Sequence, residues 1–317
     1  MEPQDIKIAG ITIAPGEEKQ IDAQIAKLPS RTPIDIPIIV SRSTKPGPTL
    51  LITGGMHGDE INGIEIVRRI IANNYHRPLI GTMICIPILN VYGFINFSRQ
   101  TSDGGKDINR SFPGTRNGSL ASQLAYRLSQ DILPLIDYGI DFHTGGARIN
   151  NYPQVRAQLD DPKNLELAQA FSPKFMIHSP FREKSFRKEA AKAGKSILVY
   201  EGGESLRLRK HAIDVGVNGL LRVMKHLNMR EEAPVSKGGL FHIKKSSWLR
   251  AKSAGIYHSF CRTGEFIEKG TVVGLITGPY GEFEHKMKAP TSGYAIAINN
   301  KPVVNRGDAL IHIGFVE

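Results

Sequence analysis

The chain alternates short apolar runs with segments in which apolar residues recur at helical spacing. The first clear pair begins at the run 50–52, which lies between Pro48 and Gly54 and predicts a buried strand. Apolar residues at positions 61, 64, 67 and 71 then predict an amphipathic helix. The same reasoning predicts strands at 81–87, 138–143 and 196–200 and helices at 120–132 and 216–224. This alternation indicates an open α/β sheet.

The two ends of the chain follow another pattern. Residues 1–48 carry short alternating stretches split by Pro-Gly pairs, and they predict edge strands that lead into the main sheet. Around residues 233–239 the pattern changes to short strands and turns. We therefore predict a first domain at 1–232 and a smaller, β-rich domain at 233–317.

The predicted second domain contains a repeat. Its glycines are spaced 15 residues apart in one half (255 to 270) and 14 in the other (293 to 307). Two similar halves predict a small β-barrel or sandwich. The pattern resembles biotinyl/lipoyl-type domains, but no lysine occupies the hairpin that is modified in those carriers. We expect a lid or a scaffold for the site instead of a swinging arm.

Composition limits the classes of protein. The 317 residues include no apolar run long enough to cross a membrane, and the first residues lack the features of a signal peptide. The two cysteines, Cys85 and Cys261, are far apart and lack metal-binding spacing. These features favour a cytoplasmic protein that does not bind membranes.

The net charge is +11, but the basic residues are scattered and aromatic residues make up only 7% of the chain. A nucleic-acid-binding surface is therefore not expected. A small anionic substrate accounts for the charge better, and solubility alone remains an alternative. Assembly into a homo-oligomer is left open.

His57 and Glu60 follow the first predicted strand, where it turns into a helix. Ligand sites of open α/β sheets form at this end of the strands. Side chains three residues apart in a helical turn can point the same way, and imidazole and carboxylate together suit Zn²⁺. Because His-x-x-Glu is common by chance, a third ligand is needed. His143 also ends a predicted strand, so it is the best third ligand, and Asp141 could orient its imidazole.

Two further segments carry candidate chemistry. Glu201 ends the predicted strand 196–200 beside two glycines and could act as a general base. Glu204 competes with it, but we expect Glu204 to face solvent. The polar loop 99–114 contains Arg99, Asn109 and Arg110, which suit recognition of a carboxylate. Alternatively, this loop is solvated and forms salt bridges to Asp103 and Asp107.

Taken in order, these residues resemble the succinylglutamate desuccinylase/aspartoacylase family, relatives of the zinc carboxypeptidases. The resemblance implies a doubly wound, mostly parallel α/β sheet followed by a β-rich domain. It also implies a role for each motif residue: zinc ligation by His57, Glu60 and His143, catalysis by Glu201, polarisation of the scissile carbonyl by Arg99, and binding of a substrate carboxylate by Asn109 and Arg110.

The predicted reaction is zinc-assisted hydrolysis of the amide bond of an N-acyl amino acid or a related small acidic amide. A zinc carboxypeptidase or amidase acting on acidic or γ-glutamyl peptides is the alternative with the same residues. A binding protein without activity is the third candidate. The stretch 151–195 offers no clear residue of the acyl pocket, and Arg156 is a guess.

Overall fold

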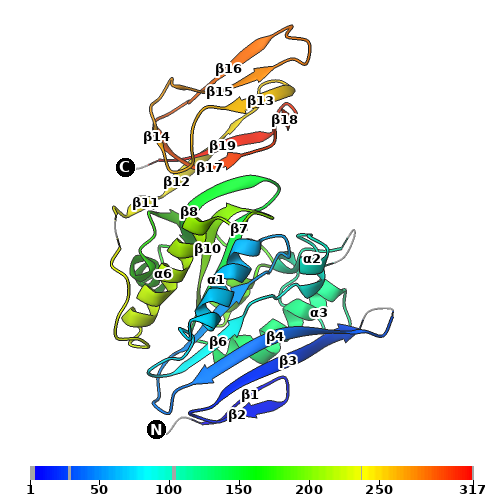
Figure 1. Ribbon diagram of the computed structural model, residues 1–317, viewed down its shortest axis with the longest axis vertical. Coiled ribbons are helices and arrows are strands. Elements are labelled where there is room, and N and C mark those ends of the chain that lie inside the picture. The colour runs from blue at the N-terminus through cyan, green and yellow to red at the C-terminus, as the bar shows by residue number, and fades with distance from the viewer. Residues whose placement is uncertain (1–3, 28–29, 102–104, 237, 316–317) are drawn as a thin grey trace.

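The computed structural model describes residues 4–27, 30–101, 105–236 and 238–315, and in this part of the chain a mixed sheet of thirteen strands forms the framework (Figure 1). Four neighbouring strands at its centre are parallel. In spatial order they are β6 (Thr82–Ile86), β5 (Thr49–Gly54), β7 (Tyr138–Gly145) and β10 (Ser196–Glu204). All four lie at predicted strands, so the expected α/β sheet with a parallel centre is confirmed.

Antiparallel strands extend this centre on both sides. On one side β4 (Pro33–Arg42) pairs with β6, and β3 (Glu18–Lys27) pairs with β4. The prediction that the N-terminal segment leads into the sheet is therefore confirmed for these two strands. The first alternating stretch forms a separate hairpin of β1 (Ile6–Ile8) and β2 (Ile11–Ile13).

Helices cover both faces of the sheet, as a doubly wound fold requires. One face carries α1 (Ile61–Ala72), α4 (Pro162–Phe171) and α6 (Lys210–His226). The other carries α3 (Leu120–Arg127) and α5 (Phe186–Lys192), and the short α2 (Val91–Ile95) follows β6. On α1, Ile66, Val67 and Ile70 are fully buried in the core that α6 shares. Burying each such side chain stabilises the fold by about 1.5–3 kcal/mol.

The helix predicted at 120–132 is shorter than expected. After Arg127 the chain forms a π-helical turn at Leu128–Ile132 and a 3₁₀ turn at Leu133–Leu135. Pro134 explains the change, because it has no amide hydrogen and its ring clashes with the carbonyl four residues earlier. The α-helical hydrogen bonds therefore give way to other spacings near this residue.

The far side of the sheet runs into the C-terminal part of the chain. Next to β10 lies β8 (Ile149–Ala157), which pairs with β17 (Gly293–Asn299). The sheet continues through β19 (Ala309–Phe315) to β12 (Lys245–Arg250). Three short strands join at its side: β9 (Phe175–His178), β11 (Phe241–Ile243) and β14 (Phe266–Ile267). Backbone hydrogen bonds thus cross the boundary expected at residue 233.

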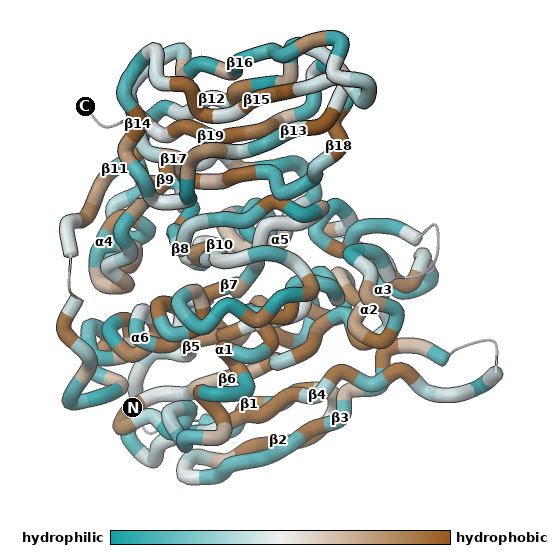
Figure 2. Tube along the Cα trace, turned by 45° about the horizontal axis from the view of Figure 1, so that its top comes forward, coloured by the Kyte–Doolittle hydropathy of each residue, from teal (hydrophilic) through white to brown (hydrophobic). Residues whose placement is uncertain are grey.

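A separate antiparallel sheet lies at the outer end of the molecule (Figure 1). Its order is β16 (Glu284–Lys288), β15 (Val272–Thr277), β13 (Gly255–Ser259) and β18 (Val303–Val304). Its apolar side chains share a core with β17 and β19. Figure 2 shows the apolar positions on β15 and β19 and the hydrophilic character of β16. The β-rich content is confirmed, and closure into a barrel or sandwich stays a prediction.

The glycine repeat has a conformational basis in this region. Gly270 and Gly307, the second glycine of each half, have φ angles of +87° and +91°. Side chains with a Cβ rarely adopt this conformation, so both turns favour glycine. Among the described residues, no helix is both long enough and apolar enough to cross a membrane.

Candidate metal centre and active site

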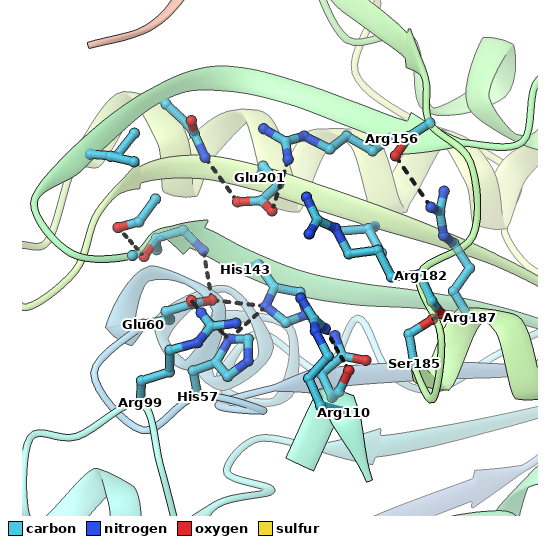
Figure 3. A pocket seen from close by; sticks show the side chains of 18 of the residues that line it. His57, Glu60, Arg99, Arg110, His143, Arg156, Arg182, Ser185, Arg187 and Glu201 are labelled. Carbon is cyan, nitrogen blue, oxygen red and sulfur yellow. Dashed lines mark hydrogen bonds and ion pairs between the residues drawn. The ribbon is translucent and has the colours of Figure 1, made fainter. Parts of the chain in front are cut away.

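Three ligand-type side chains meet at the carboxyl ends of β5 and β7 (Figure 3). His57 lies in the turn after β5, Glu60 directly precedes α1, and His143 lies near the end of β7. They are 2, 1 and 4% exposed, and one ligand atom from each lies within 4.8 Å of the others. The strand-to-helix turn places His57 and Glu60 on one side, and the neighbouring parallel strand brings His143 to them.

Both imidazoles are oriented by carboxylates behind them. His57 Nε2 lies 3.1 Å from Asp107 Oδ1, and His143 Nε2 lies 2.7 Å from Asp141 Oδ2. Each ring therefore turns Nδ1 toward Glu60, at 2.8 Å in both cases, and the two Nδ1 atoms are 3.2 Å apart. Imidazoles held in this way by carboxylates are typical of metal ligands. The donor set fits Zn²⁺, with three protein ligands and room for a fourth.

Electrostatics in this centre favour positive charge. Burial opposes the charged form of His143, but Asp141 and Glu60 outweigh it, and the pKa of His143 is raised well above its usual value. Burial also opposes ionisation of Glu60, yet the two imidazoles hold its pKa well below the usual value. The two buried carboxylates, Glu60 and Asp141, lie beside two imidazoles and would stabilise a divalent cation bound there.

Glu201 lies on β10, directly beside His143 in the register of the parallel pair. Asn151 Nδ2 donates to Glu201 Oε2 at 2.9 Å, and Arg156 Nη1 lies 3.7 Å from Oε1. Burial raises the pKa of Glu201, and the positive charge of Arg156 partly offsets this effect. A carboxylate with a raised pKa binds a proton more readily, as a general base requires.

Glu204 was expected to face solvent, and this prediction is wrong because the side chain is buried. It is only 6% exposed, because β10 continues past a bulge and Glu204 pairs with Gly145 of β7. Its carboxylate lies 3.4 Å from Arg209 Nη2. Glu204 does not line the cavity that contains Glu201.

Arg99 connects two carboxylates of the centre. Its Nη1 donates to Glu60 Oε1 at 3.1 Å, and its Nη2 donates to Asp107 Oδ2 at 2.9 Å. The alternative of a solvated loop includes the salt bridge to Asp107, but Arg99 itself lines the cavity. Asp103, the other partner in that alternative, lies outside the described residues.

Asn109 and Arg110 lie on a 3₁₀ turn at Ile108–Arg110. The side chain of Asp107 begins the turn by accepting from Asn109 N at 2.8 Å. Asn109 Oδ1 accepts from Phe186 N at 2.9 Å, which fixes the amide so that its NH₂ group is the end left for a ligand. The Arg110 side chain is exposed, and both residues line the same cavity as His57, Glu60 and His143.

The structure brings all seven residues predicted for the site to one cavity of about 210 Å³. The sequence analysis named Asp107 but gave it no role beside His57. It also missed several residues that line the cavity: Asn151, Ser179, Arg182, Arg187 and Trp248. Arg156, which the sequence analysis offered as a guess for the acyl pocket, also lines the cavity. Successive side chains of a strand point to opposite faces, and Val155 packs into the core shared with α6 while Arg156 lines the cavity. This alternation is the sequence signal that could have identified the cavity-lining residues of β8.

Comparison with known proteins agrees with this geometry. Residues 46–227, more than half of the chain, match the model of the succinylglutamate desuccinylase/aspartoacylase catalytic domain. A protein of Halomonas elongata named N-alpha-acetyl-L-2,4-diaminobutyric acid deacetylase is 25% identical over 294 residues, which cover 89% of this chain and 86% of that protein.

Two solved structures share the fold. The succinylglutamate desuccinylase/aspartoacylase of Rhodobacter sphaeroides has a TM-score of 0.87 at 24% identity, covering 100% of this chain and 99% of that one. The product-bound ectoine utilization protein EutE (DoeB) of Ruegeria pomeroyi has a TM-score of 0.84 at 20% identity, covering 94% of each chain. The resemblance noted in the sequence is thus confirmed, and the chain belongs to the succinylglutamate desuccinylase/aspartoacylase family.

Proposed function

We propose that this protein is a zinc-dependent deacylase that hydrolyses the amide bond of an N-acyl amino acid or a related small acidic amide. The observation that carries the proposal is the cluster of His57, Glu60 and His143 in one cavity with Glu201. The deacetylase named for the Halomonas elongata relative supports the same class of reaction. A cavity of about 210 Å³ favours a small substrate over a peptide.

His57 Nδ1, His143 Nδ1 and the Glu60 carboxylate would hold the ion. When bound, Zn²⁺ supplies Lewis acidity for the substrate carbonyl and for the attacking water. Glu201 accepts the proton that this water loses and then delivers it to the leaving amine. Asn151 holds Glu201 in place for both transfers.

Three residues of the loop after α2 complete the proposed site. Arg99 lies against the metal centre, so its guanidinium can stabilise the negative charge that develops on the carbonyl oxygen. Asn109 and Arg110 bind the carboxylate of the amino acid. Binding at that end holds the amide in one orientation relative to Glu201.

The test is to measure zinc content and hydrolysis of N-acetyl amino acids by the purified protein and two variants. We expect near-stoichiometric zinc and turnover in the wild-type protein, and loss of both in His57→Ala. The matched control is His226→Ala, which changes an exposed histidine of α6 and should retain both. Turnover that persists in zinc-free protein would refute the proposal.

Three further expectations are also proposals. A cytoplasmic location is supported by two cysteines that remain unpaired. The division into 1–232 and 233–317 is supported by the separate core of the C-terminal strands. Assembly into a homo-oligomer is tested by measuring the molar mass of the protein in solution.

A further inference from the structure

One side of the cavity is formed by a side chain from the C-terminal strands. Trp248 lies on β12 and lines the same cavity as the proposed metal ligands and Glu201. Among the described residues that line this cavity, the apolar side chains are those of Ile149, Val199 and Trp248, and the indole of Trp248 is the largest of them. The proposed reaction gives this ring no role.

The strand register places Trp248 on the same face of the sheet as the residues around the proposed base. Trp248 on β12 is the register partner of His312 on β19. His312 pairs with Ala297 on β17, and Ala297 pairs with Asn151 on β8. Register partners on neighbouring antiparallel strands point to the same face of a sheet. Because Asn151 donates to Glu201, this row runs from the proposed base to Trp248, which bounds the cavity on the side of the C-terminal strands.

His312 holds the Trp248 indole in one orientation. The two rings are stacked, with centroids 4.6 Å apart and planes at 5° to each other. His312 Nε2 lies 2.9 Å from Ser246 Oγ, and this contact fixes the imidazole in turn. Burial lowers the pKa of His312 to about 3, and the charge of Arg156 acts in the same direction, so the stacked ring is uncharged at neutral pH. A fixed ring against one face of the indole restricts the rotamers open to Trp248.

From this arrangement we infer that Trp248 is a specificity-determining residue, whose indole limits the length of the substrate chain on this side of the cavity. His312 is the positioning residue that fixes the limit. The inference rests on the proposed function. A cavity of about 210 Å³ has little spare room, and a large ring that cannot turn away excludes a longer chain by steric overlap. Removing the ring should therefore admit longer chains without abolishing the reaction.

Two groups of an N-acyl amino acid can extend toward Trp248, the acyl chain and the side chain of the amino acid. Both are alkyl groups in simple substrates, so the same ring would limit either one. Three compounds distinguish them. N-acetyl-L-alanine is short at both ends, N-hexanoyl-L-alanine has a long acyl chain, and N-acetyl-L-norleucine has a long side chain.

The experiment measures kcat/KM for these three compounds with the zinc-loaded wild-type protein, Trp248→Ala and the milder Trp248→Leu. The wild-type protein should prefer N-acetyl-L-alanine to one of the long compounds by about 10- to 200-fold, the range for discrimination of a methylene group in a pocket. In Trp248→Ala this preference should fall by about tenfold or more. The long compound whose relative kcat/KM rises identifies the substrate group that faces the indole.

The matched control is Phe260→Ala, which removes an aromatic ring that is 59% exposed and does not line the cavity. Its ratios of kcat/KM should equal those of the wild-type protein. A ratio within one preparation does not depend on how much of a variant is folded. The inference is overturned if Trp248→Ala keeps the wild-type ratios, or if Phe260→Ala changes them as much.

The role of His312 has a spectroscopic readout, because Trp248 is the single tryptophan of the chain. His312→Ala removes the stacked ring, so acrylamide should quench the tryptophan fluorescence more strongly and the preference for N-acetyl-L-alanine should weaken. His312→Phe keeps an aromatic face beside the indole and should restore both values. An unchanged preference in His312→Ala, whatever the quenching, would overturn the positioning role.

A binding measurement separates this inference from the proposed function. If the wild-type protein hydrolyses none of the three compounds, the proposed reaction fails for them, and isothermal titration calorimetry with the intact compounds still tests Trp248. Supporting evidence is a long compound that gains affinity relative to N-acetyl-L-alanine in Trp248→Ala. No such gain for either long compound contradicts the inference.

Discussion

Replacing Glu201 with glutamine tests the proposed base directly. The amide keeps the shape of the side chain and an oxygen that can accept the 2.9 Å hydrogen bond from Asn151. It cannot accept a proton at neutral pH. Removing general-base catalysis lowers kcat by about 10²- to 10⁴-fold, which corresponds to about 3–5 kcal/mol in the barrier. We expect a loss in this range with zinc retained, because none of the three proposed ligands is changed.

The assay combines kcat, zinc content and a pH profile. In the wild-type protein, burial raises the pKa of Glu201, so the base is increasingly protonated as the pH falls through a value above 4.5. Below that pKa, kcat/KM should fall about tenfold per pH unit. In Glu201→Gln this dependence on the base should vanish, and zinc content measured at each pH excludes loss of the ion as the cause.

The matched control is Glu204→Gln, which makes the same change on the same strand outside the cavity. This variant should keep its activity if it is folded, as circular dichroism can check. The reasoning is refuted if Glu201→Gln retains activity within threefold of the wild-type protein, or if Glu204→Gln loses as much.

The remaining predictions concern metal affinity and stability. Asp141→Asn should weaken zinc binding by about 10- to 100-fold in a chelator competition, because the carboxylate orients the His143 imidazole; unchanged affinity would contradict this role. Arg68 and Arg69 lower the pKa of Glu65 to about 2, so its contribution to stability is present above pH 4.5 and lost as the pH falls toward 2. In Glu65→Gln, the free energy of unfolding in urea should depend less on pH between 4.5 and 2 than in the wild-type protein. The same dependence in both proteins would contradict a stabilising role of the ion pairs with Arg68 and Arg69. Ile66→Ala should reduce the free energy of unfolding in urea by about 2–5 kcal/mol, since the side chain is fully buried, and a loss below 1 kcal/mol would refute tight packing there.

The centre of the fold could be predicted because its signals are local. Apolar periodicity identified β5 and α1, and the junction between them placed His57 and Glu60 at the edge where parallel strands end. His143, the third proposed ligand, followed from the same rule on the neighbouring strand. Each prediction needed only a short stretch of sequence.

The rest of the cavity depends on contacts between distant segments. Arg187 reaches the wall from the segment around α5, and Trp248 reaches it from β12, and neither has a motif that marks it. The burial of Glu204 follows from a bulge in β10 that the residues 201–204 do not reveal. The pairing of β17 with β8 is equally invisible, since strand pairing leaves no pattern in either strand alone.

That pairing has a consequence for attempts to divide the protein. Asn151 of β8 is the register partner of Ala297 of β17, and the same asparagine holds Glu201. Truncating the chain before residue 233 would leave the β8 edge without β17, and such an exposed strand edge promotes aggregation. The C-terminal strands thus protect the sheet from self-association while they hold one wall of the cavity. We expect the isolated segment 1–232 to form insoluble material, whatever activity its motifs encode.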